Sequence, residues 1–279
     1  MRLVTFRTTF GTRAGRLADD DDGVTPLDAA DIGALLAAPG WQERAAAANE
    51  PTRDLADLEL APVVPRPGKI ICVGHNYRAH IEEMGAEVPE HPTLFAKFAG
   101  ALIGPRDPVV LPRVSDKVDW EVELALVIGT PVRHADAEEA AEAIAGYTVS
   151  NDVSVRDWQR RTPQWLQGKT FEATTPLGPA LVTADGVDIA AGLTLRCSVD
   201  DRLVQESSTA DQLFGPATLV AYISQIITLE PGDVVLTGTP SGVGAGRTPP
   251  EFLSAGQTLT TAIVGLGECV NPVVAEGRP

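Results

Sequence analysis

Hydrophobic residues in the second part of the chain come in short runs that glycine and proline interrupt. Six runs have the length and composition of strands, at residues 69–74, 121–129, 146–154, 193–200, 233–238 and 258–265. Helical spacing of apolar residues is limited mainly to the segments 77–85, 136–146 and 216–229. Strands and helices do not alternate regularly, so the pattern predicts a mostly β fold with some α structure (α+β) rather than a doubly wound sheet.

The first part of the chain shows a different pattern. Alternating apolar and polar residues around Gly11 predict a small β-hairpin, and residues 28–49 predict helical structure with a break at a Pro-Gly pair. A proline-rich segment follows, which excludes a helix interior or a central strand. We therefore predict a small N-terminal α+β domain over residues 1–65 and a larger domain, the candidate catalytic domain, over residues 66–279.

Composition narrows the class of partner. The formal net charge is -16, which argues against nucleic acid and against anionic membrane surfaces. The acidic run 19–22 is expected to be a solvated turn, because adjacent carboxylates do not converge on one ion. Three scattered cysteines give neither a disulfide framework nor a metal pair, and no stretch has the length of a membrane span or of a signal peptide's apolar core. These features predict a cytoplasmic protein.

Two glutamates lie inside the most apolar predicted strand. Residues two apart on a strand point to the same side, so Glu121 and Glu123 face one direction. Adjacent buried carboxylates repel unless a cation lies between them, and oxygen ligands favour Mg²⁺, Mn²⁺ or Ca²⁺. Asp152, near the end of another predicted strand, could complete the site. The alternative is a strand with one wet face whose glutamates pair with lysines.

The segment 77–85 carries a possible acid–base pair. On a helix, His80 and Glu83 lie one turn apart on one face, and a carboxylate beside imidazole raises its basicity. This arrangement suits a general base that acts on water. His75 and Glu82 compete for these roles, and an incidental surface ion pair is the simpler alternative.

Two lysines and one loop could contact an anionic substrate. Lys97 lies near two phenylalanines and Lys169 follows a glycine. Each lysine either extends its ammonium group to solvent or supplies a fixed positive charge to an anionic substrate. The glycine-rich loop 236–246 lacks the ending of a phosphate loop. It is expected to present backbone N–H groups and the Thr239 hydroxyl to a carboxylate.

In their order along the chain, these segments resemble the fumarylacetoacetate hydrolase family from residue 68 to the C-terminus. The resemblance is carried by VGHNYRAHIEEMG, DWEVELALVIG, GYTVSNDVSVRDWQ, GKTFEATTPLGPALVT and VVLTGTPSGVG. It implies a catalytic domain of the mixed β-roll type, a homodimer and a bound Mg²⁺ or Mn²⁺, with Ca²⁺ as a substitute. Relatives often have Lys-Pro and a hydroxyl residue where this chain has Lys97-Phe98-Ala99, which implies a more apolar distal pocket.

The resemblance also implies residue roles. The metal ligands would be Glu121, Glu123 and Asp152. The catalytic residues would be His80 and Glu83, which activate water, and Lys169, which stabilises negative charge. The substrate contacts would be Lys97, Arg156, Gln159 and Thr239.

The implied activity is hydrolysis of a carbon–carbon bond in an acylpyruvate or a related small anionic 2-oxo acid, through a stabilised pyruvate enolate. The same scaffold suits oxaloacetate decarboxylation or isomerisation of a hydroxy-diene-dioate, which need no attacking water. Sugar-acid dehydration or hydrolysis and metal-free binding of a small acid are further alternatives. The His80–Glu83 pair favours hydrolysis among them.

Overall fold

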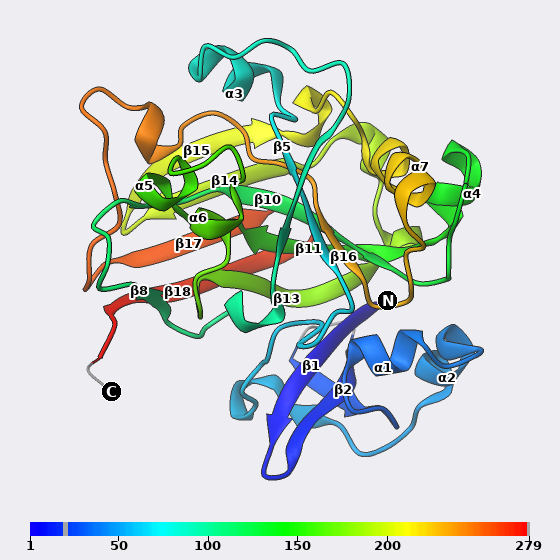
Figure 1. Cartoon of the computed structure of the whole chain (residues 1–279). Helices are drawn as coiled ribbons and strands as arrows, with labels where there is room; N and C mark the ends of the chain where they lie inside the picture. Colours follow the sequence, from blue (N-terminus) through cyan, green and yellow to red (C-terminus); the bar gives the residue numbers. More distant parts are fainter. Residues whose placement is uncertain (19–21, 278–279) are drawn as a thin grey trace.

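The computed structural model describes residues 1–18 and 22–277 (Figure 1). Residues 19–21 of the acidic run lie outside the described residues, so the predicted turn stays a prediction. The described part of the chain is built mainly of strands, with short helices around them, which confirms the predicted α+β class.

The larger sheet has the strand order β4-β3-β2-β1-β13-β11-β10-β16-β5-β6, and β7 also pairs with β13. Its strands are β1 (Arg2–Thr8), β2 (Gly11–Leu17), β3 (Gly23–Pro26), β4 (Arg53–Asp54), β5 (Ile70–Gly74), β6 (Thr93–Lys97), β7 (Leu102–Ile103), β10 (Val122–Ile128), β11 (Ile144–Asn151), β13 (Thr175–Thr183) and β16 (Val234–Leu236).

A second sheet of order β15-β14-β17-β18-β8 packs against β11 and β13, so that the two sheets enclose one core. Its strands are β8 (Val109–Leu111), β14 (Thr194–Val199), β15 (Arg202–Ser208), β17 (Thr258–Ile263) and β18 (Gly267–Ala275). A small antiparallel pair joins β9 (Val118–Asp119) and β12 (Ser154–Val155).

The helices are short. They are α1 (Ile32–Leu36), α2 (Trp41–Ala47), α3 (Arg78–Glu83), α4 (Ala137–Glu142), α5 (Arg156–Gln159), α6 (Leu166–Lys169) and α7 (Pro216–Ile226). Helices α4 and α7 pack together at one side, and α3 lies above the sheets at the end of the β5 segment (Figure 1). Among the described residues, no helix is long and apolar enough to cross a membrane.

Strand β10 explains how two glutamates enter the interior. Val122, Leu124 and Leu126 belong to the core between the sheets, whereas Ala125 and Val127 belong to a second core on the opposite face. Glu121 and Glu123 have the same parity as Ala125, so they point to that opposite side, as the strand pattern predicts. The strand is buried along its whole length between β11 and β16.

The N-terminal residues extend the larger sheet. Strands β1 and β2 form the predicted hairpin, and β1 pairs with β13. The predicted helical segment is broken between α1 and α2, as expected at the Pro-Gly pair. Leu3 and Ile32 share a core with Ile70, so the N-terminal region packs on the rest of the chain. The domain boundary near residue 66 stays a prediction.

Candidate metal centre and active site

Three buried carboxylates converge where β10 begins and β11 ends. Val122 of β10 pairs with Asn151 of β11, and the Asp152 N–H donates to the Glu121 carbonyl at 2.9 Å. This register brings Asp152 beside Glu121 and Glu123, with one oxygen of each carboxylate within 4.8 Å of the others. The convergence of these three side chains on one point agrees with the sequence hypothesis of a metal site.

Cations hold two of the three carboxylates. Lys169 Nζ lies 2.6 Å from Glu121 Oε2 and 2.8 Å from Asp152 Oδ2. Lys97 Nζ lies 2.6 Å from Asp152 Oδ1, and an Arg156 nitrogen lies 2.6 Å from Glu121 Oε1. Of the two strand glutamates, Glu121 therefore does pair with a lysine, but in the interior rather than on a wet face.

Glu123 is the carboxylate without a cationic partner in residues 1–18 and 22–277. It accepts a hydrogen bond from the Gly238 N–H at 2.7 Å. Burial, Asp152 and Glu121 together raise the pKa of Glu123 well above its usual value. Burial also disfavours the charged form of Glu121, but Arg156 and Lys169 outweigh it and lower the pKa of Glu121 to about 2.

The donor set fits a hard divalent cation. All the ligand atoms are carboxylate oxygens, which suit Mg²⁺, Mn²⁺ or Ca²⁺ better than zinc. Glu123 makes no ion pair among the described residues, and a cation between the three carboxylates would favour its ionised form. The three carboxylates could therefore hold a divalent cation, as the sequence predicts.

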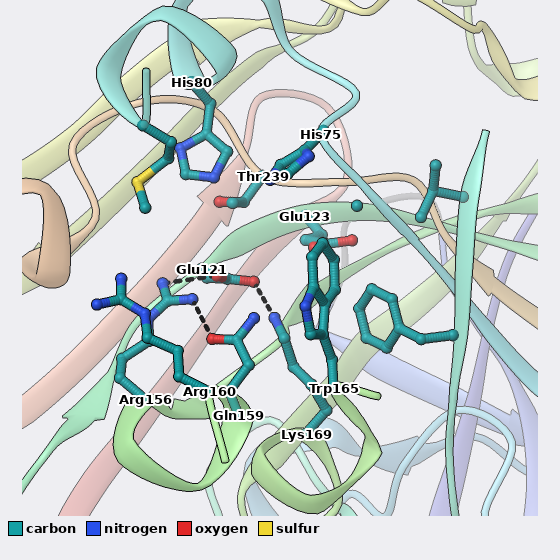
Figure 2. Close-up of a pocket in the computed structure, with 14 residues that line it drawn as sticks. His75, His80, Glu121, Glu123, Arg156, Gln159, Arg160, Trp165, Lys169 and Thr239 are labelled. Carbon is teal, nitrogen blue, oxygen red and sulfur yellow. Dashed lines mark hydrogen bonds and ion pairs between the residues drawn. The ribbon is translucent and has the colours of Figure 1, made fainter. Parts of the chain in front are cut away.

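The predicted acid–base pair is formed. His80 Nδ1 lies 3.0 Å from Glu83 Oε2, and Glu83 Oε1 accepts from the Gly242 N–H at 2.8 Å. Glu83 is thereby fixed, and it fixes the imidazole in turn. Figure 2 shows the His80 ring pointing into the cavity, so its Nε2 is left for a substrate or a water.

The cavity above the carboxylates has a volume of about 160 Å³. This is below the roughly 300–1,000 Å³ of drug-sized sites, so it favours a small substrate. Figure 2 shows its lining, formed by Val73, Gly74, His75, His80, Met84, Phe95, Glu121, Glu123, Arg156, Gln159, Arg160, Trp165, Lys169 and Thr239.

Three of the four predicted substrate contacts line this cavity: Arg156, Gln159 and Thr239. Lys97 does not, because its ammonium group is buried against Asp152. Phe98 is 60% exposed and does not line this cavity, so the more apolar distal pocket stays a prediction. The strand β6 ends at Lys97, and its neighbour therefore turns outward.

The glycine-rich loop presents backbone N–H groups, but to carboxylates of the protein itself. Besides binding Glu123 and Glu83, it donates to Asp119 from Gly244 at 2.7 Å and from Ala245 at 3.0 Å. The loop therefore holds acidic residues of the active site in place. The Thr239 hydroxyl accepts from Gln205 Nε2 at 3.0 Å and remains at the cavity wall.

The sequence did not identify Asp119 and Trp165 as residues of the site. It left His75 as an alternative to His80 for the acid–base role. Asp119 has the strand parity of Glu121 and binds Arg156 Nε at 2.7 Å, so the alternation could have revealed it. Trp165 forms a cavity wall with its ring centroid 5.3 Å from that of His75. His75 adopts a left-handed backbone with φ of 53°, which no motif signals.

A cluster of three buried carboxylates with an oriented histidine above it, on this α+β fold, is the arrangement of an enzyme active site. Residues 69–274 match the family described as Fumarylacetoacetate (FAA) hydrolase C-terminal. The chain belongs to the fumarylacetoacetate hydrolase family, as the motif resemblance implies.

Named relatives catalyse different reactions. The chain is 43% identical to human mitochondrial oxaloacetate tautomerase FAHD2A over 98% of its own length and 92% of that protein. Among solved structures, 5-carboxymethyl-2-hydroxymuconate delta-isomerase from Mycobacterium smegmatis is 36% identical with a TM-score of 0.82, covering 100% of both chains. Maleylpyruvate hydrolase from Sphingobium sp. SYK-6 is 30% identical with a TM-score of 0.82, covering 99% of this chain and 100% of that chain.

Proposed function

We propose that the protein is a divalent-metal-dependent enzyme that interconverts the keto and enol forms of a small 2-oxo dicarboxylic acid such as oxaloacetate. The observation that carries the proposal is the placement of His80, which Glu83 holds, on the same small cavity as Glu121 and Glu123 of the carboxylate cluster. Similarity to the human oxaloacetate tautomerase over nearly the whole chain supports this substrate. It favours an oxaloacetate reaction over carbon–carbon hydrolysis, which the sequence alone favoured.

Glu121, Glu123 and Asp152 would hold the ion, which we propose is Mg²⁺ or Mn²⁺. When bound, the ion supplies a Lewis acid that polarises the 2-oxo group and its carboxylate. This polarisation makes the hydrogens on the adjacent carbon acidic.

His80 then takes a proton from that carbon at its Nε2, because Nδ1 is bonded to Glu83. The electron pair of the C–H bond forms the carbon–carbon double bond, and the oxo oxygen becomes negative. Return of the proton to this oxygen gives the enol, so the reaction needs no attacking water and breaks no carbon–carbon bond.

Lys169 stabilises the negative oxygen. Burial lowers the pKa of Lys169, but Asp152 and Glu121 outweigh this and raise the pKa above its usual value. The side chain is therefore a fixed ammonium group shielded from water, where such a charge acts strongly on a developing anion. Thr239, at the cavity wall, would hydrogen-bond the substrate carboxylate.

A second candidate is hydrolysis of an acylpyruvate. The same His80–Glu83 contact would activate a water for attack on a distal carbonyl. The similarity to maleylpyruvate hydrolase supports this alternative, at lower identity than that to the tautomerase.

Parallel assays separate the two reactions. Wild-type protein is treated with a chelator, reloaded with Mg²⁺ or Mn²⁺, and tested for oxaloacetate tautomerisation and for acylpyruvate cleavage. We expect metal-dependent tautomerisation, with a loss of about 10²–10⁴-fold for His80→Ala. Glu82→Gln is the control, because Glu82 is exposed on the same helix. Metal-dependent acylpyruvate cleavage without tautomerisation would replace the first proposal by the second.

A further inference from the structure

Arg160 is the one arginine or lysine of the cavity lining that has no carboxylate partner among the described residues. Arg156 is paired with Asp119 and Glu121, and Lys169 is also paired with Glu121. The Arg160 side chain is exposed at the rim of the cavity. Its positive charge is therefore available to a ligand.

The backbone places Arg160 directly next to Arg156. Arg160 follows α5, and its N–H donates to the Arg156 carbonyl at 3.2 Å, so the two side chains project from the same face one turn apart. Figure 2 shows Arg156 bonded to Glu121 and Gln159, while no dashed line reaches Arg160. The Arg156 charge is compensated by Asp119 and Glu121, so Arg160 is the charge beside it that remains for a ligand.

The cavity wall opposite Arg160 is aromatic and carries no arginine or lysine. It is formed by Trp165 and Phe95, whose ring centroids are 5.4 Å apart. We call Glu121, Glu123 and Asp152 the floor of the cavity. A dicarboxylic 2-oxo acid that is bound at the floor through its 2-oxo end has its second carboxylate farther out in the cavity. Arg160 is the unpaired cation in that direction, and a guanidinium group matches a carboxylate with two parallel hydrogen bonds.

We propose that Arg160 binds the distal carboxylate of the substrate and selects dicarboxylic over monocarboxylic 2-oxo acids. This inference rests on the proposed function, because it assigns the far end of the substrate in the same site. Arg160 would be a specificity-determining residue, whereas the groups around the 2-oxo end would act on every 2-oxo acid.

The next residue supplies a matched control. The Arg161 guanidinium carbon lies 3.5 Å from the centroid of the Trp158 ring, so this side chain is engaged by a stacking contact. Arg161 is exposed like Arg160 but does not line the cavity. Arg161→Met removes the same charge from the same segment without touching the proposed contact.

Kinetics with a charged and an uncharged substrate test the contact. We expect Arg160→Met to raise KM for oxaloacetate roughly tenfold with little change in kcat, because a charge-assisted hydrogen bond at a half-open site is lost. KM for the 4-methyl ester of oxaloacetate, which lacks the distal charge, should not change. Arg160→Lys should retain part of the preference, and Arg161→Met should behave as wild type. An equal rise in KM for both substrates would overturn the inference.

A binding measurement keeps the test independent of the reaction. Malate and lactate are titrated by calorimetry into Mn²⁺-loaded wild type, Arg160→Met and Arg161→Met. We expect wild type and Arg161→Met to prefer the dicarboxylate malate roughly tenfold, and Arg160→Met to lose the preference. If wild type shows no preference, or if Arg160→Met keeps it, the inference is wrong. An enzyme without tautomerase activity that still shows the Arg160-dependent preference would instead refute the proposed reaction alone.

Discussion

The floor of the active-site cavity and the N-terminal hairpin belong to one sheet, yet they bury different kinds of side chain. The floor buries Glu121, Glu123 and Asp152 beside lysine and arginine side chains. The hairpin buries Val4 and Phe6 in a small apolar cluster. The comparison indicates that the hairpin region contributes to stability, whereas the floor is arranged for binding and chemistry.

The physical costs differ in the same way. Each buried apolar side chain stabilises the fold by about 1.5–3 kcal/mol. A buried ion pair is close to neutral, because desolvation offsets the attraction, and an unpaired buried carboxylate is unfavourable. The raised pKa of Glu123 reflects such an unfavourable site. Substitutions in the two regions should therefore separate activity from stability.

The largest effect is expected for Glu123→Gln. The substitution removes a proposed metal ligand, so we expect tautomerase activity to fall by at least about 10²–10³-fold. Because the pKa of Glu123 is raised in the folded protein, ionisation of this group opposes folding at neutral pH. The metal-free variant should therefore unfold at an equal or higher denaturant concentration than wild type.

The control for Glu123→Gln is Glu142→Gln, which changes an exposed carboxylate on α4. It should leave both activity and metal affinity unchanged. If Glu123→Gln kept full metal affinity and full activity, the assignment of the floor would be wrong.

The next effect concerns stability. Phe6 is fully buried in the hairpin and Phe10 is fully exposed at its tip. We expect Phe6→Ala to lower the free energy of unfolding by about 3–5 kcal/mol, because it leaves a cavity in a packed cluster. Phe10→Ala should change it by less than about 0.5 kcal/mol. Urea unfolding measures both, and a large change in kcat of folded Phe6→Ala would contradict the separation of the two regions.

The smallest effect is the pH dependence of metal binding. The pKa of Glu123 is raised above the usual carboxyl range, so binding of a cation must displace its proton over a range of higher pH. Metal affinity should therefore rise with pH, by up to about tenfold per unit while one proton is displaced. Calorimetry in two buffers of different ionisation enthalpy counts this proton. Proton release that is the same in Glu123→Gln and in wild type would show that another group titrates.

Two of the three floor carboxylates were predictable because the sequence of β10 has a clear strand pattern. Its apolar run fixes a buried strand, and a period of two then places Glu121 and Glu123 on one side. The His80–Glu83 contact follows equally from helical spacing. Convergence with Asp152 could not be derived from local pattern, because it depends on the register between β10 and β11.

Other features were hidden by proline and by distance along the chain. Strand β13 contains Pro176 and Pro179, which argue against a central strand, yet it lies between β1 and β11. A register irregularity in its pairing with β11 falls between Gly178 and Val182, where it accommodates Pro179. The pairing of Lys97 with Asp152 joins residues 55 positions apart, so the chain itself gave no sign that this lysine lies behind the floor.

The central claim is that Glu121, Glu123 and Asp152 bind one hard divalent cation. Anomalous diffraction from crystals soaked in Mn²⁺ tests it most directly. The account predicts one peak between the three carboxylates, at metal–oxygen distances of about 2.0–2.3 Å, in wild type and none there in Glu123→Gln. A wild-type protein that is active with Mn²⁺ but shows no peak at this position would contradict it.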